Sequence, residues 1–186
     1  EDAYQHATNV DNLDFVAVTD HSNSFDNADS ASISDCSMSE EWKEGHALAT
    51  QYTTSGFVCI YGFEMTWSNG LGHITALQNY YATLKTRPDS ISQFNHPGTT
   101  FGDFSDFAYY DEEIDKLITT IEVGNGEGAI GSSGYFPSYE YYQRALDKGW
   151  HLAPTNNQDN HKGVWGDANT ARSVVLVDSL TQENIY

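Results

Sequence analysis

Four of the seven histidines in this chain lie at the ends of apolar segments, beside glycine, proline, asparagine or aspartate. Three carboxylates share this placement, and the full set is Asp20, His21, Glu64, His73, His96, Asp159 and His161. Imidazole and carboxylate together are ligands that suit zinc, manganese or iron and not calcium. Side chains at strand ends collect on one side of a β/α fold, where ligands bind. The pattern therefore predicts a site for divalent metal ions.

The prediction depends on the set as a whole, because a single histidine is more often a surface or core residue than a ligand. Glu64 is the most informative member, since an unpaired carboxylate in an apolar strand is costly to bury. The other histidines, His6, His46 and His151, fall within helical segments or at the start of a strand. No functional role is assigned to these three.

A β-hairpin is expected around Asn69-Gly70, which is a strong signal for a two-residue turn between strands at residues 57–66 and 71–77. In that register Glu64 and His73 share one face of the hairpin. They lie one diagonal step apart, which is roughly 7–8 Å between α-carbons. Both side chains could then reach one metal cluster.

Two further local rules orient the remaining candidates. In an extended segment Asp159 and His161 point the same way, because side chains two positions apart share a face. His96 precedes Pro97, whose ring restricts the residue before it to an extended conformation. We therefore expect each of these side chains to have a fixed direction at the end of its strand.

The elements that must position these side chains alternate between helix and strand. Helices are expected at residues 1–10, 39–52 and 137–148, and strands at 13–18, 57–66, 71–77, 90–95, 117–123, 150–154 and 173–177. Ser39 is expected to cap the second helix, and Gly149 to end the third. Strands that alternate with helices predict an α/β fold with a layered or barrel-like architecture.

Composition limits the classes of function. The formal net charge is −19, from 27 acidic and 8 basic side chains, so the surface repels nucleic acids and anionic membranes. No apolar run approaches the ~18 residues that a membrane span needs. Cys36 and Cys59 have neither metal-site spacing nor a disulfide framework, and Cys59 is expected in the core. Richness in Asn, Ser, Thr and Tyr suits a secreted, extracellular or cell-surface bacterial protein, with the cytoplasm as the alternative.

Between residues 13 and 161 the chain resembles the PHP (polymerase and histidinol phosphatase) family of metal-dependent phosphoesterases. Five short motifs carry the resemblance, and they follow one another in the same order as in that family. The motifs are Thr19-Asp20-His21 after an apolar run, Gly62-Phe63-Glu64 with Gly72-His73, Asn95-His96-Pro97-Gly98, Ile121-Glu122-Val123 with Asn125-Gly126, and Asp159-Asn160-His161. Each motif is short, but the ordered set is specific.

The resemblance implies a distorted (β/α)7 barrel with two or three divalent metals, which are zinc, manganese or iron. Its implied metal ligands are His21, Glu64, His73, His96, Asp159 and His161. Glu64 would bridge two metals, and Asp20 would be a ligand or would orient an imidazole. Family members open with a His-x-His pair on the first strand, and this chain contains none. We therefore expect residues 1–186 to be one incomplete barrel domain with a β-hairpin, truncated at the N-terminus and the C-terminus.

The expected reaction is hydrolysis of a small phosphate ester. A metal pair about 3.5–4 Å apart would lower the pKa of a bridging water, and the resulting hydroxide would attack phosphorus in line. The expected catalytic residues are Asp20, His21, Glu64, His96 and Asp159. Substrate binding is assigned to Arg172, Lys162 and Asn125, with surface ion pairs as the alternative for the two cations.

Two other functions fit the same residues. One is metal-dependent hydrolysis of another bond, such as an amide or a carbamate. The other is a non-catalytic or metal-depleted binding module, whose partners would be other domains of a larger extracellular protein. The missing His-x-His pair favours this last alternative, in which the chain by itself would be inactive.

Overall fold

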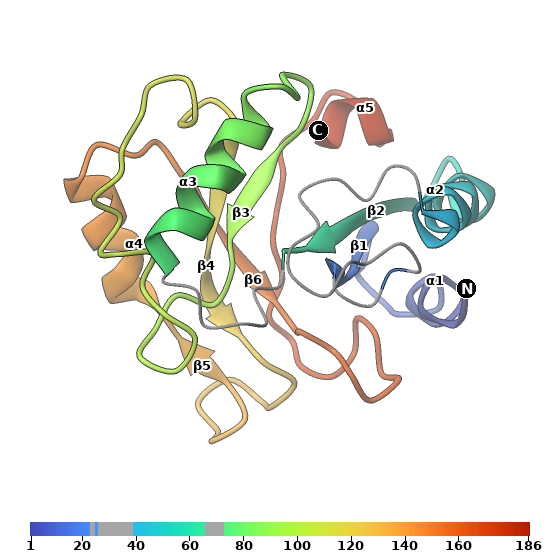
Figure 1. Ribbon diagram of the computed structural model, residues 1–186. Helices are drawn as coiled ribbons and strands as arrows, with labels where there is room; N and C mark the ends of the chain where they lie inside the picture. The colour runs from blue at the N-terminus through green and yellow to red at the C-terminus, as the bar shows by residue number, and fades with distance from the viewer. Residues whose placement is uncertain (23–24, 26–38, 66–72) are drawn as a thin grey trace. The chain divides into compact units, whose positions relative to one another are not determined.

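The computed structural model describes residues 1–22, 25, 39–65 and 73–186. The chain has a mixed α/β fold built on parallel strands, and it divides into two compact units (Figure 1). The first unit comprises Glu1–Gly70, His161–Asp167 and Val175–Tyr186, and the second comprises Leu71–Asn160 and Ala168–Val174. Within the described residues the strands form open sheets and no closed barrel. None of the helices described is long and apolar enough to cross a membrane.

The first unit is organised around two parallel strands, β1 (Phe15–His21) and β2 (Val58–Glu64). The register places Phe15 opposite Val58 at the start of the pair and His21 opposite Glu64 at its end. Because the strands are parallel, their carboxyl ends lie at the same edge of the sheet. The expected strands are confirmed, although β1 extends further than expected and includes His21 itself.

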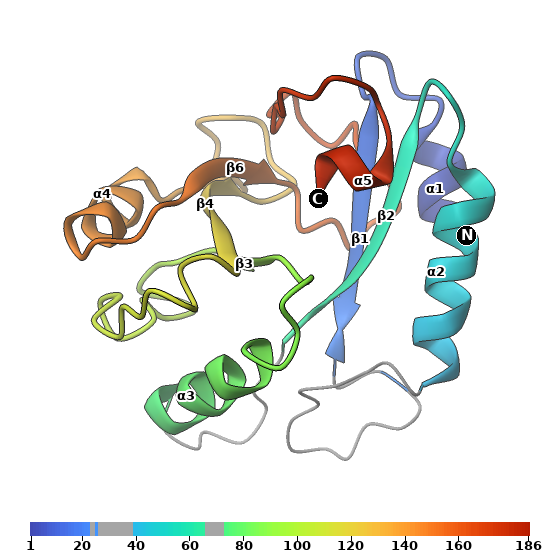
Figure 2. The same ribbon diagram turned by 90° about the horizontal axis from the view of Figure 1, so that it is seen from above.

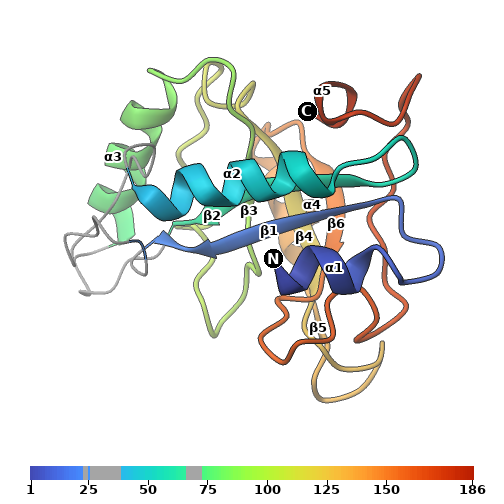
Figure 3. The ribbon, with the colours of Figure 1, turned by 90° about the vertical axis from the view of Figure 1, so that its right-hand side faces the viewer.

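Helices α1 (Asp2–Ala7) and α2 (Glu40–Tyr52) cover the same face of the β1–β2 pair (Figure 2, Figure 3). The expected cap of α2 is confirmed, since the Ser39 hydroxyl accepts a hydrogen bond from the Trp42 backbone N–H at 3.0 Å. The short helix α5 (Gln182–Ile185) is tethered to β2 through the Gln182 side chain, which donates to the carbonyl oxygen of Cys59 at 2.5 Å.

The core of the first unit is an aromatic and aliphatic cluster between the strands and the helices. Its buried members are Tyr4, Ala7, Phe25, Ala49, Phe57, Cys59 and Tyr61. Cys59 is fully buried, as the sequence predicted, and burial raises the pKa of its thiol to about 11. Cys36 lies outside the described residues.

A close approach between α2 and β2 depends on Gly45. A Cβ atom at this position would overlap the ring of Tyr61. Alanine is the better helix former by about 1 kcal/mol. Nevertheless, we expect Gly45→Ala to lower the free energy of unfolding by about 1–3 kcal/mol, because an overpacked core must shift backbone or side chains.

The matched control is Gly56→Ala, since a Cβ atom at Gly56 would meet nothing within 4 Å. Both substitutions remove similar conformational freedom from the unfolded chain. The helical preference for alanine acts only at Gly45 and opposes the expected loss, so a lower stability of Gly45→Ala reports the contact with Tyr61. Urea unfolding followed by circular dichroism measures both. Equal unfolding midpoints for the two variants would contradict the packing described here.

The second unit is organised around β4 (Ile118–Asn125). This strand pairs in parallel with β3 (Ser92–Phe94) and β6 (Ala153–Asn157), and its last two residues pair antiparallel with β5 (Phe136–Pro137). Helix α4 (Tyr139–Asp147) packs against β4. It is followed by Gly149, whose φ of 99° ends it as expected.

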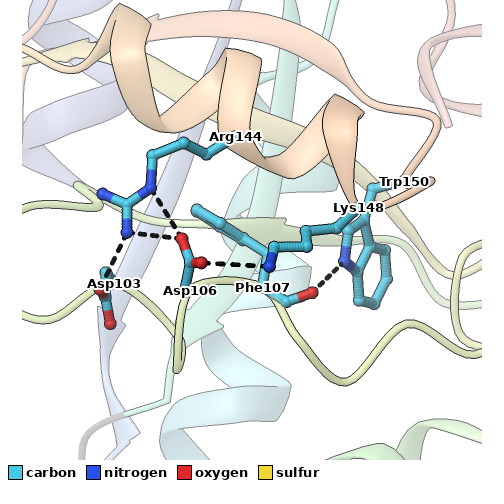
Figure 4. Close-up of polar contacts among 6 residues, drawn as sticks. All are labelled: Asp103, Asp106, Phe107, Arg144, Lys148 and Trp150. Atoms are coloured by element: carbon cyan, nitrogen blue, oxygen red, sulfur yellow. Dashed lines mark hydrogen bonds and ion pairs between the residues drawn. The ribbon is translucent and has the colours of Figure 1, made fainter.

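Trp150 anchors the core of the second unit, with 2% of its surface exposed. Its ring contacts Phe94 edge to face at a centroid distance of 5.1 Å, and its indole N–H donates to the carbonyl oxygen of Phe107 at 3.0 Å. Figure 4 shows the loop before Phe107 bound to α4: the Arg144 guanidinium contacts Asp103 and Asp106. Hydrogen bonds from Arg144 and Lys148 hold the pKa of Asp106 below its usual range.

Residues 73–77 form the start of helix α3 (His73–Leu84), so the expected returning strand of the hairpin is wrong. Leu77, Tyr81 and Leu84 are buried at helical spacing, which gives this segment one apolar helical face. The expected turn at Asn69-Gly70 lies outside the described residues. The cross-strand argument that paired Glu64 with His73 therefore does not hold.

Two other expected strands differ from the structure. The strand at 150–154 begins instead at Ala153, because Trp150 turns into the core before the chain pairs with β4. Residues 173–177 form no strand, and Val174 and Leu176 are 83% and 96% exposed. Strand propensity alone does not make a strand where no neighbouring strand pairs with it.

Candidate functional site

Three of the predicted ligands come together in the first unit. His21 and Glu64 are the last residues of β1 and β2 and are partners in the parallel register, so their side chains leave the same face of the sheet. The His21 Nδ1 atom lies 3.7 Å from Glu64 Oε2. The ring of His161 stacks beside that of His21, with centroids 5.9 Å apart and planes inclined by 30°. These three side chains form what we call the His21 cluster.

Asp20 lies on the other face of the same two strands. Successive strand residues point to opposite faces, so Asp20 faces the helices and His21 faces away from them. The Tyr61 hydroxyl donates a hydrogen bond to Asp20 Oδ2 at 3.0 Å, and the Tyr61 ring packs on α2 at Gly45. The structure therefore holds Asp20 through Tyr61 and does not bring it to the His21 cluster.

A second group of site candidates surrounds Glu122 in the second unit. Glu122 is 2% exposed and lies on β4, between β3 and β6. Its carboxylate accepts a short hydrogen bond from the His96 backbone N–H and one of 2.7 Å from Asn157 Nδ2. The amide of Asn125 donates to both carboxylate oxygens at 3.2 Å. We call this arrangement the Glu122 network.

The surroundings of Glu122 act on the pKa of its carboxyl in two opposite directions. Burial raises the pKa of its carboxyl above the ordinary value, and hydrogen bonds from Asn157 and the His96 backbone oppose part of that rise. Glu122 was named within one of the sequence motifs but was given no functional role. The signal for Glu122 was present, since a carboxylate inside an apolar strand is the feature that drew attention to Glu64.

His96 does not have the extended backbone expected before Pro97. Its φ is +32°, in a region that residues other than glycine rarely occupy. Such conformations cost of order 1–3 kcal/mol and persist where the surroundings determine them. Here the hydrogen bond from the His96 N–H to buried Glu122 overrides the preference imposed by proline. The Phe101 ring lies 4.6 Å from the imidazole.

Asp159 also departs from its expected backbone. Strand β6 ends at Asn157, and Asp159 has a φ of +47°, so the segment to His161 is not extended. The argument that Asp159 and His161 share a face is therefore wrong. His73 is the first residue of α3, and its side chain is not among those described.

The expected substrate-binding residues have differing surroundings. Arg172 Nη1 donates to the carbonyl oxygens of Asn169 and Ala171 at 2.8 and 2.7 Å, so the guanidinium supports its own loop. Asn125 is buried and directs its amide to Glu122. Lys162 is exposed in the first unit, beside His161.

The His21 cluster has the chemistry of a divalent-metal site. Two ligands that each lie about 2.0–2.2 Å from a tetrahedral ion are about 3.3–3.6 Å apart, close to the observed His21–Glu64 separation. Imidazole and carboxylate are donors that zinc, manganese and iron share. Among the described residues, however, no three His, Cys, Asp or Glu side chains already have the arrangement of a metal site.

The chain matches no protein-family model, no curated protein and no solved structure. The likeness to the PHP family thus rests on the ordered motifs in the sequence.

Proposed function

We propose that this chain is a metal-dependent hydrolase that cleaves small phosphate esters. The observation that carries the proposal is the His21 cluster, in which parallel pairing aligns His21 with Glu64 at 3.7 Å and a distant segment brings the His161 ring beside that of His21. The resemblance to the PHP family implies six metal ligands, and these three residues are among them. The PHP-type barrel and the ligand roles of His73, His96 and Asp159 belong to the same proposal.

His21, Glu64 and His161 would hold the ion, which is zinc, manganese or iron. The chemistry that a bound divalent ion supplies is polarisation of a phosphoryl oxygen and a lowered pKa for a nearby water. Glu64 would contribute the negative charge that retains the cation, and the imidazoles would contribute neutral donors. The cation also offsets locally the repulsion between a phosphate ester and a chain of net charge −19.

A substrate panel with metal removal and return tests this function. The chain is treated with a chelator, freed of it, and assayed with and without Mn²⁺ or Zn²⁺ on aryl phosphate mono- and diesters, glycerol phosphate, an anilide and a carbamate. We expect phosphate-ester cleavage only when metal is returned, because the ion supplies the electrophile. Full activity in the chelated sample would contradict the proposal, and cleavage of the anilide or carbamate alone would redirect it to another bond.

A second candidate is a non-catalytic binding module. The position of Asp20 favours it, because the Tyr61 hydroxyl holds this carboxylate on the face opposite the His21 cluster. A module of this kind would bind the metal without cleaving any member of the panel. Metal binding by calorimetry together with a silent panel would therefore select this candidate.

A further inference from the structure

The Glu122 carboxylate joins the carboxyl ends of three strands in the second unit. It lies on β4, accepts from the backbone N–H of His96 just beyond β3, and accepts from the side chain of Asn157 at the end of β6. Asn125, at the end of β4, donates to both of its oxygens. Each of these contacts fixes a strand end, and ligand-binding residues of parallel α/β sheets lie at such ends.

A buried carboxylate is an expensive way to connect strands. An apolar side chain of similar volume would fill the same space without desolvating a charge. The hydrogen bonds that Glu122 accepts come from neutral amide and backbone N–H groups, and a charge interaction with His96 also favours the ionised carboxylate. Since an apolar side chain could fill this space, we infer that the contribution of Glu122 is the placement of its two acceptor oxygens.

The contact with the largest local consequence is the one to His96. This residue has a left-handed backbone immediately before Pro97, although its sequence position favours an extended one. An acceptor buried on the neighbouring strand holds the His96 N–H in this conformation. The backbone conformation sets the direction of the Cα–Cβ bond. The Phe101 ring packs against the imidazole and restricts its rotation.

We propose that Glu122 is a positioning residue, which fixes the direction of the His96 imidazole through the His96 backbone and is not itself a metal ligand. This inference rests on the proposed function, in which His96 is a ligand. Glu122 would affect metal binding through its hydrogen bond to the His96 backbone, without contacting the ion. Outer partners that orient metal-binding imidazoles commonly change metal affinity by about 10–100-fold.

The test is Glu122→Gln, studied by NMR of the histidine rings in the metal-free protein and by metal titration. Glutamine keeps the volume and one acceptor oxygen, but its NH₂ group must face one of the present donors. We expect the His96 ring resonances to shift or broaden and metal affinity to fall about 10–100-fold. Assignment of the His96 signals comes from their loss in His96→Gln.

The matched control is Ser138→Ala. The Ser138 hydroxyl donates to the backbone carbonyl of Glu122 at 2.6 Å, so its loss removes a buried hydrogen bond from the same residue and leaves the carboxylate intact. Ser138→Ala is expected to lower stability without moving the His96 signals. If Glu122→Gln does not fold, Asn157→Ala replaces it, because it removes the 2.7 Å donor to one carboxylate oxygen and is expected to give a smaller shift at His96.

The outcomes separate this inference from the proposed function. Unchanged His96 signals in the Glu122 variant, or equal shifts in that variant and Ser138→Ala, would overturn the positioning role. Shifts confined to the Glu122 variant support it. If Glu122→Gln shows those shifts but the wild-type chain cleaves no substrate with any metal, the proposed function fails and the positioning of His96 stands.

Discussion

A Glu64→Gln variant is expected to bind divalent metal more weakly than the wild type by more than about 100-fold. Loss of an outer partner of a ligand already costs about 10–100-fold, and Glu64 is proposed to contact the ion directly. The substitution keeps the shape of the side chain but removes the charge that retains the cation beside His21. Hydrolysis in the metal-loaded state is expected to fall at least as far. Calorimetric titration of Mn²⁺ or Zn²⁺ into the chelator-treated chain measures the affinity.

Glu44→Gln is the matched control for that experiment. Glu44 is exposed on α2, in the same unit, and the same change in charge there leaves the His21 cluster untouched. The control is expected to keep the wild-type affinity and rate. Equal affinities for wild type and Glu64→Gln would remove Glu64 from the metal site and with it the basis of the proposed function.

A Trp150→Ala variant is expected to lose about 3–5 kcal/mol of stability, the cost typical of deleting a large aromatic side chain from a core. A whole domain has only about 5–15 kcal/mol, so the second unit of this variant is expected to be close to unfolding. Trp150 contacts Phe94 on β3, the strand that leads to His96, and its indole N–H donates to Phe107. The substitution therefore also loosens the segment that carries His96.

Two further substitutions calibrate this result. Trp150→Phe keeps a ring but leaves the Phe107 carbonyl without its donor, and it is expected to cost about 1–3 kcal/mol. Val174→Ala changes an exposed side chain of the same unit and is expected to stay within about 0.5 kcal/mol of wild type. Denaturant unfolding followed by tryptophan fluorescence or circular dichroism ranks the three. A Trp150→Ala variant as stable as Val174→Ala would contradict the description of the core.

The sequence was sufficient to predict those helices and strands that depend on residues close together in the chain. Ser39 was identified as a cap because its hydroxyl needs only the backbone three residues later, and the structure contains that bond. The strands β1, β2 and β4 were found from apolar, β-rich runs. The expectation of a strand at residues 71–77 was wrong because a strong turn signal at Asn69-Gly70 outweighed the helical spacing of Leu77 and Leu84.

The candidate site was predictable as a set of residue types but not as a geometry. The pairing of His21 with Glu64 arises from the parallel register of β1 and β2, which no local pattern encodes. The left-handed backbone of His96 arises from a carboxylate on another strand that overrides the preference of a residue before proline. Tyr61 gave no signal, because its role depends on the missing Cβ of Gly45 on a separate helix.

The most direct test of the central claim is an anomalous difference map from crystals of the chain loaded with Mn²⁺ or Zn²⁺. The account predicts a peak within about 2.0–2.3 Å of His21 Nδ1 and of a Glu64 carboxylate oxygen, with the His161 ring turned toward it. A loaded protein that hydrolyses phosphate esters while its metal lies away from both His21 and Glu64 would contradict the account.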